Sequence, residues 1–194
     1  ELYQRLLRQY PDYERVDGVY YLIGYCLNEM ARMREALEAW LALVCANEFK
    51  YPNPPPEPLP GEERPYVPRH PALHLNETMP RMGRELIDRY KGCEPVREDA
   101  RFVTETWFRI GEYHFDDYID LNSLSFAYSA YQQILRWPDD QNYNLALYKI
   151  AWTFYRGGQY EKSIEYFAKL IDWSDERQRL TGREGSMLRP EAME

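Results

Sequence analysis

The chain has 194 residues, of which 44% are hydrophobic and 15% aromatic, and this is enough to bury a core in one domain or a short array of repeats. Its formal net charge of -8 and pI near 5.1 create a field that repels phosphate backbones, so nucleic acid is not expected as a partner. No run of about 18 apolar residues occurs, so no membrane span is expected within this sequence.

Both ends of the sequence read as parts of helical elements. At residues 1–12, Leu2, Leu6 and Leu7 share one face and Tyr10-Pro11-Asp12 ends the pattern, as in the second helix of a hairpin. At residues 186–194, Pro190 falls in what would be the first turn of another helix. We therefore expect a single domain that is a fragment of a longer chain, with a truncated repeat at each end.

Three copies of one pattern follow in chain order, at residues 14–50, 97–138 and 140–174. A first helix carries a small residue, Gly24, Gly111 or Ala151, that allows a second helix to approach closely. The second helix repeats a small residue followed four positions later by a large one. The matching positions are Tyr20, Ile23, Leu27, Ala36, Trp40 and Leu43; Trp107, Ile110, His114, Ala127, Tyr131 and Ile134; and Leu147, Ile150, Phe154, Ser163, Phe167 and Leu170.

The second copy nearly spells the signature of a known repeat. Trp107-x2-Ile110-Gly111-x2-His114, then Ala127-x3-Tyr131, then a proline resembles the tetratricopeptide repeat. This resemblance implies an all-α fold, a right-handed solenoid of antiparallel helix hairpins. From Gly111 to Ala127 is sixteen residues, against twelve from Gly24 to Ala36, so the second hairpin should have a longer tip around residues 117–122.

A proline-rich insertion at residues 51–96 interrupts the repeats. Ten of the fourteen prolines lie between Pro52 and Pro80, which excludes a helix or a central strand there. Within the insertion, the apolar spacing from Met79 to Tyr90 predicts one short helix. The insertion is either an ordered flap across the repeats or a flexible linker, and the aromatic and apolar content after Tyr66 favours the flap.

The three cysteines differ in context. Cys26 lies beside Leu27 on a helix and is expected to be a small core residue. Cys45 and Cys93 bracket the insertion, and we hypothesise a disulfide between them, with two free buried thiols as the alternative. An observed bridge would imply an oxidising compartment such as the periplasm.

No catalytic, metal or cofactor constellation is recognisable. His70 and His74 are four apart, but Pro71 intervenes and no Cys or carboxylate completes a metal site. His114 replaces the usual signature tyrosine and is expected to be a hydrogen-bonded core residue. The sequence has no phosphate-binding loop and no nucleophile elbow, so it is not expected to be an enzyme or to hold a cofactor.

The face of each first helix opposite its packing stripe is the expected binding groove. In tetratricopeptide-like repeats this face lines the concave surface, and here it is aromatic and mildly acidic. It fits an extended or helical protein segment with apolar or aromatic anchors, and the basic pattern that clamps a terminal carboxylate is absent. Alternatively, these aromatics pack against the insertion itself. The groove residues are Tyr21, Tyr25, Asn28, Glu105, Phe108, Glu112, Phe115, Tyr148, Trp152, Tyr155 and Arg156.

A narrower resemblance is carried by Tyr10-Pro11-Asp12 with Gly24 thirteen residues after the proline, and by residues 145–152 and 188–192. These stretches look like bacterial envelope tetratricopeptide lipoproteins, including the deltaproteobacterial gliding-motility type. The resemblance implies a non-catalytic interaction scaffold in a larger envelope complex, periplasmic or associated with the outer membrane, otherwise cytoplasmic. The alternative is a regulatory domain of an enzyme whose catalytic domain lies outside this sequence.

Overall fold

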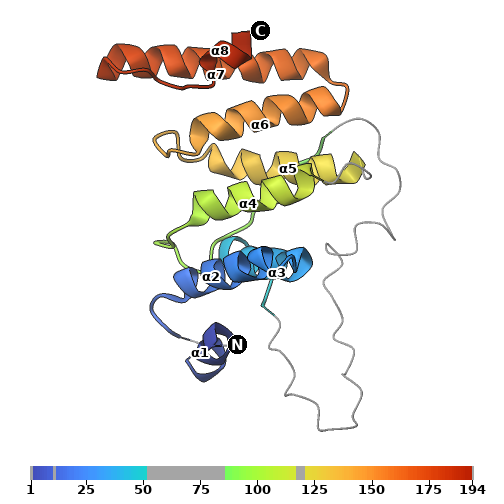
Figure 1. Ribbon diagram of the computed structural model, residues 1–194, viewed down its shortest axis with the longest axis vertical. Coiled ribbons are helices and arrows are strands. Elements are labelled where there is room, and N and C mark those ends of the chain that lie inside the picture. The colour runs from blue at the N-terminus through green and yellow to red at the C-terminus, as the bar shows by residue number, and fades with distance from the viewer. Residues whose placement is uncertain (1, 11, 52–85, 117–120, 194) are drawn as a thin grey trace. The chain divides into compact units, whose positions relative to one another are not determined.

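A computed structural model describes residues 2–10, 12–51, 86–116 and 121–193, and all regular secondary structure in these residues is helical (Figure 1). This confirms the predicted all-α class. The chain forms two compact units, an N-terminal unit of Glu1–Met79 with Cys93–Val103 and a C-terminal unit of Pro80–Gly92 with Thr104–Glu194. Most of the predicted insertion, with His70 and His74, and the predicted long tip at 117–120 lie outside the described residues.

The N-terminal unit contains α1 (Leu2–Gln9) and a hairpin of α2 (Val16–Glu29) and α3 (Met33–Val44). The turn between α2 and α3 closes with two backbone hydrogen bonds, from Ala31 N–H to Asn28 O and from Arg32 N–H to Leu27 O, both 2.9 Å. This is the Schellman pattern, which needs a left-handed residue at its centre. Ala31 supplies it with φ of 57°.

The α2–α3 hairpin depends on the absence of a side chain at Gly24. A Cβ placed there would lie 2.1 Å from Nε1 of Trp40, which is buried on α3. Such a distance is far inside van der Waals contact, so the indole occupies the space that glycine leaves open. The predicted role of the small residue in close helix approach is confirmed in this hairpin, and again at Gly111, where a Cβ would lie 2.3 Å from the Tyr131 ring.

A non-helical segment, residues 93–102, runs against the end of α3 and is called the strap. Val96 N–H donates to Leu43 O and Ala46 N–H donates to Glu94 O, each at 2.8 Å. The structure also joins Cys45 to Cys93 by a disulfide; the two residues are 48 positions apart in sequence, and their Cα atoms are 4.5 Å apart. The strap is thus attached to the hairpin both covalently and through backbone hydrogen bonds.

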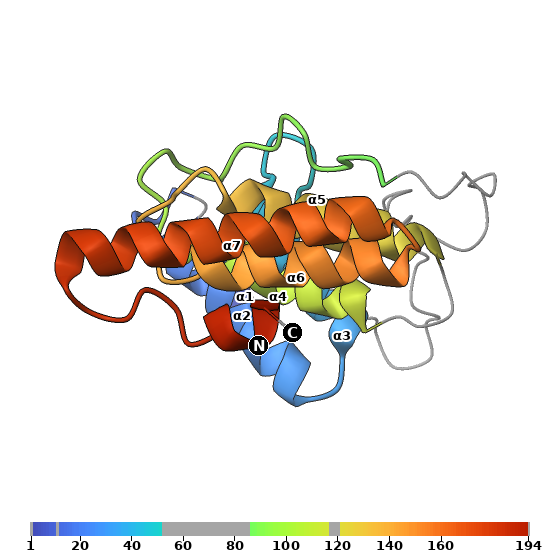
Figure 2. The same ribbon diagram turned by 90° about the horizontal axis from the view of Figure 1, so that it is seen from above.

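The C-terminal unit contains α4 (Val103–Phe115), α5 (Leu121–Ile134), α6 (Tyr143–Arg156), α7 (Tyr160–Thr181) and α8 (Arg189–Met193). Helix α6 packs against α5 and α7, α7 also contacts α8, and α6 and α7 lie side by side in both views (Figures 1 and 2). Gly158, with φ of 71°, closes the α6–α7 turn in the same Schellman pattern as Ala31. None of the described helices is long and apolar enough to cross a membrane.

Helix α7 continues past residue 174, where the third repeat was expected to end. No glycine or proline occurs within it, and it stops at Gly182, whose φ of 68° is left-handed. Except for Phe167, which is half-buried, the predicted apolar stripes form the core of the unit. Its buried members include Trp107, Ile110, His114, Ala127, Tyr131, Ile134, Leu147, Ile150, Ala151, Phe154 and Leu170.

The helix predicted from Met79 to Tyr90 is not formed in its described part, residues 86–90. There the backbone is held by α5: Arg89 N–H donates to Ser129 Oγ at 2.5 Å, and Ser129 Oγ donates to Ile87 O at 3.0 Å. The apolar spacing was misleading because Tyr90 is an isolated anchor, 3% exposed, and not one member of a helical stripe.

Two single-residue predictions have opposite outcomes. His114 is buried and hydrogen-bonded, with Nε2 3.1 Å from the Tyr90 hydroxyl, which confirms the core role. Cys26 was predicted to be a core residue, and this is wrong because its side chain is exposed. The buried stripe of α2 runs through Ile23 and Leu27, and Cys26 points away from it at helical spacing.

Candidate protein-binding surfaces

The N-terminal unit has a cavity of about 360 Å³ on the outward face of α2. Aromatic and aliphatic side chains form most of its lining, and its two charged residues are Arg15 and Arg101. The wall is shared by α1, by α2 with the turn before it, and by the end of the strap. The lining residues are Tyr3, Leu6, Tyr13, Arg15, Gly18, Val19, Tyr21, Leu22, Arg101 and Phe102.

Phe102 supplies one aromatic wall of this cavity. Its ring stacks on Tyr21 with centroids 4.6 Å apart and planes 12° apart, and the Arg101 guanidinium lies 5.5 Å from the ring centroid. The backbone of Phe102 has φ of 62°. A left-handed conformation costs a residue with a Cβ roughly 1–2 kcal/mol, so the surrounding contacts must hold the strap in place.

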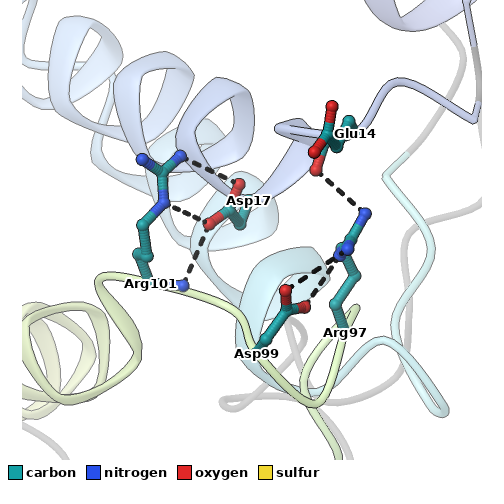
Figure 3. A network of polar contacts seen from close by, with 5 residues as sticks. All are labelled: Glu14, Asp17, Arg97, Asp99 and Arg101. Atoms are coloured by element: carbon teal, nitrogen blue, oxygen red, sulfur yellow. Dashed lines mark hydrogen bonds and ion pairs between the residues drawn. The ribbon is translucent and has the colours of Figure 1, made fainter.

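Asp17 binds the end of the strap and holds it against α2 (Figure 3). Its carboxylate is buried in the first turn of α2 and accepts hydrogen bonds from the backbone N–H of Arg101 at 2.9 Å and from Arg101 Nε at 3.1 Å. Burial by itself would raise the pKa of Asp17, but the hydrogen bonds and charge of Arg101 outweigh it and lower that pKa. Asp17 therefore stays ionised at neutral pH.

A second arginine of the strap reaches the chain before α2. Arg97 Nη1 donates to the backbone oxygen of Glu14 at 3.0 Å, while its Nε pairs with Asp99 at 2.9 Å (Figure 3). Arg97 and Arg101 of the strap are thus both hydrogen-bonded to the segment at the start of α2. This arrangement fixes Phe102 against Tyr21.

Of the three groove residues predicted on α2, the structure places only Tyr21 in the cavity wall. Tyr25 is 43% exposed one turn further along α2, and Asn28 is half-buried near the end of the helix. The residues that sequence reasoning missed are Arg101 and Phe102. Their contacts with α2 span more than 80 residues, and no local motif signals them.

In the C-terminal unit, two of the predicted groove residues of α4, Glu112 and Phe115, contact α6. Lys149 Nζ lies 2.9 Å from the Glu112 carboxylate, which also accepts the Tyr131 hydroxyl hydrogen bond. Burial and the charge of Glu112 raise the pKa of Tyr131, so its phenol remains a donor.

Two further groove residues, Phe115 and Arg156, contact one another. The Arg156 guanidinium lies 4.5 Å from the Phe115 ring centroid and donates to its backbone oxygen. Glu105 pairs with Arg109 on its own helix at 3.0 Å, and the Phe108 ring lies 5.8 Å from that of Tyr131. These side chains therefore serve contacts within the unit.

The predicted residues Tyr148, Trp152 and Tyr155 belong to a group shared by α6 and α7, in which Tyr148 and Phe167 are half-buried and the other members exposed. The Trp152 ring lies 5.3 Å from that of Tyr155 and 5.8 Å from that of Phe167, and the Tyr155 ring lies 5.4 Å from that of Tyr160. Tyr155 and Tyr160 are 52% and 56% exposed. We call this group the aromatic patch; it comprises Tyr148, Trp152, Tyr155, Tyr160, Ile164 and Phe167.

Helix α8 contacts one end of the aromatic patch. The Tyr148 hydroxyl donates to Glu191 at 2.9 Å, and Arg189 pairs with Asp175 of α7 at 2.6 Å. Ile164, which lies between Tyr160 and Phe167 on α7, is 68% exposed. In the part of the chain that the structure describes, no three His, Cys, Asp or Glu side chains gather into a group that could hold a metal ion.

Antiparallel helix hairpins with small residues where the helices cross are typical of helical-repeat proteins, and this architecture belongs to that class. Residues 145–172, which cover most of α6 and the first half of α7, match the family model of the tetratricopeptide repeat. No curated protein and no solved structure matched the chain. Repeats of this family generally mediate protein–protein interaction and are typically non-catalytic.

Proposed function

We propose that this chain is a non-catalytic interaction scaffold that binds an apolar segment of a partner protein through the aromatic patch. The observation that carries the proposal is the exposure of the contacting rings of Trp152, Tyr155 and Tyr160, with Ile164 exposed four residues after Tyr160, on the hairpin that matches the repeat family. Clustered exposed aromatics are typical of binding surfaces, because tyrosine and tryptophan bury large area at low cost in side-chain entropy.

Site-specific photo-crosslinking in the native cell tests this proposal. The full-length protein would carry a benzophenone amino acid in place of Tyr155 or Ile164, with Leu180 of α7, which is 75% exposed, as the matched control position. We expect a discrete adduct with one partner at both patch positions and none at Leu180. Trp152→Ala should reduce the adduct at Ile164.

Two outcomes would contradict the proposed site. Adducts of equal yield at Leu180 would show that crosslinking reports exposure alone. An adduct at Ile164 that Trp152→Ala leaves unchanged would show that the aromatic patch does not contribute to binding.

We further propose that the scaffold works in a bacterial envelope assembly, in the periplasm or at the outer membrane. Two observations support this: the Cys45–Cys93 disulfide fits an oxidising compartment, and the sequence resembles envelope lipoproteins. Cell fractionation with thiol counting tests it. We expect the protein in the envelope fraction with one alkylatable thiol, Cys26, and three alkylatable thiols in a cytoplasmic fraction would overturn the proposal.

A further inference from the structure

We propose that the cavity of the N-terminal unit is a second binding site, which takes one bulky apolar side chain of a partner segment and places an acidic residue of that segment near Arg15. This inference rests on the proposed function, since it names what another surface of the same scaffold binds. It depends on the strap, which belongs to none of the described helices.

The volume of the cavity fits one large apolar side chain of a partner, which we call the anchor. Ligand pockets span roughly 300–1,000 Å³, and a cavity of about 360 Å³ lies at the lower end of that range. It is walled by rings and aliphatic groups, among them Tyr21, Leu22 and Phe102. A large apolar side chain that enters it would lose its contact with water on most sides, which is how interface anchors contribute most of their binding energy.

The charge of the cavity lining indicates which kind of residue should lie next to the apolar anchor in the partner segment. The protein carries a formal net charge of -8, yet both charged residues that line the cavity are arginines. Arg101 is bound to Asp17, whereas Arg15 is exposed and lies directly before the first turn of α2. A carboxylate beside the anchor complements Arg15, and a lysine there would be repelled by it.

The backbone of Phe102 indicates that this wall is held for a purpose beyond packing. Phe102 is 42% exposed, so its left-handed φ is not compensated by full burial of its ring. Strain of this kind at an exposed residue is typical of ligand clamps. The disulfide holds the start of the strap at Cys93, and Asp17 binds Arg101 directly before Phe102, so the aromatic wall is preformed.

Gly18 provides a way to fill the cavity without damaging the fold. A Cβ at this position would meet Arg101 Nη2 at 3.4 Å and Phe102 Cε2 at 3.9 Å, which is ordinary or slightly tight contact with the end of a flexible side chain. Gly18 lies within α2, where alanine or leucine favours the helix more than glycine does. Gly18→Leu would therefore occupy the cavity, and Gly18→Ala is its matched control.

The test is a titration of the isotope-labelled chain with short peptides, followed by backbone amide NMR. The reference peptide has one Phe and one Glu two residues apart in a Gly-Ser chain, and its variants carry Gln for Glu or Ala for Phe. We expect shifts at Gly18, Arg101 and Phe102. Gly18→Leu should weaken binding at least about tenfold, and Gly18→Ala less than about twofold.

The acidic preference has its own control. Arg15→Gln should weaken the Glu peptide about threefold, the effect of one exposed ion pair, and leave the Gln peptide unchanged. Arg8→Gln removes an arginine of α1 that does not line the cavity, and it should leave both peptides unchanged. Thermal melting of each variant would verify that the N-terminal unit remains folded.

The outcomes separate this inference from the proposed function. Peptide binding that Gly18→Leu does not change would overturn the inference. Decanoate, a fatty acid with an apolar chain and a carboxylate, serves as a comparison ligand, and binding of decanoate but of none of the peptides would also overturn it. Peptide shifts confined to the aromatic patch and lost in Trp152→Ala would overturn it while supporting the proposed function. Absence of binding at both surfaces would contradict both proposals.

Discussion

The two units complete the same helix hairpin in different ways. In the N-terminal unit, the α2–α3 hairpin is covered by the non-helical strap, which a disulfide, an ion pair and backbone hydrogen bonds hold in place. In the C-terminal unit, α6 packs directly on its neighbours α5 and α7, and the segment of residues 86–90 is held by the buried Tyr90 and by hydrogen bonds with Ser129 of α5.

This difference shows which interactions stabilise each unit. Hairpin stacking uses only apolar surface that the repeat already provides, so it needs no special residues beyond the small ones at the crossing. A strap has little apolar surface of its own and depends on a few specific bonds. The N-terminal unit should therefore be sensitive to single chemical changes in the strap that have no counterpart in the C-terminal unit.

The largest expected effect is from removal of the disulfide. Because the bridge closes a loop of 48 residues, the chain-entropy model gives a loss of roughly 4 kcal/mol in unfolding free energy for Cys45→Ser with Cys93→Ser. Hydrogen exchange measured by mass spectrometry in a denaturant series would resolve the two units. We expect the loss in the N-terminal unit, and Cys26→Ser should have no effect. An equal loss in both units would contradict the comparison.

A core change tests the feature that the two units share. Gly24→Ala should cost about 3 kcal/mol, because the new methyl group would overlap the Trp40 indole. Gly18→Ala in the same helix should be neutral or stabilise by about 0.5 kcal/mol. Urea unfolding by circular dichroism would measure both. If Gly24→Ala cost no more than Gly18→Ala, the close approach of α2 and α3 would be wrong.

The smallest expected effect compares the two Schellman turns. Ala31 occupies the left-handed position that Gly158 occupies in the α6–α7 turn, so Ala31→Gly should raise the unfolding free energy by about 1 kcal/mol. Gly158→Ala should lower it by a similar amount. Thermal melting of both variants would check the pair, and a loss of stability in Ala31→Gly would show that the strain at Ala31 is compensated elsewhere.

The sequence predicts the hairpins well because their contacts are local. The stripes that contain Gly24 and Gly111 repeat at helical spacing, and each partner lies within about 20 residues along the chain. The cavity could not be predicted in the same way. Asp17 and Arg101 are 84 residues apart, and Phe102 adopts a left-handed conformation although it is not one of the residue types that signal one.

The exposure of a side chain was also harder to predict than the helix face on which it lies. Tyr21, Phe115 and Trp152 were all expected on outward faces, yet only Trp152 belongs to an exposed aromatic group; Tyr21 stacks on Phe102, and Phe115 lies under Arg156. Whether an outward aromatic is free depends on which neighbour reaches it, and a helical pattern carries no information on that neighbour.

The fit of Trp40 against Gly24 also gives the N-terminal unit an optical reporter. Trp40 is the one tryptophan in that unit, whereas Trp107, Trp137, Trp152 and Trp173 lie in the other. Its indole is 2% exposed, and among the described residues its Nε1 has no hydrogen-bond partner, so it should emit at short wavelength. With the other four replaced by phenylalanine, a red shift of this single emission would mark the opening of the α2–α3 hairpin in real time.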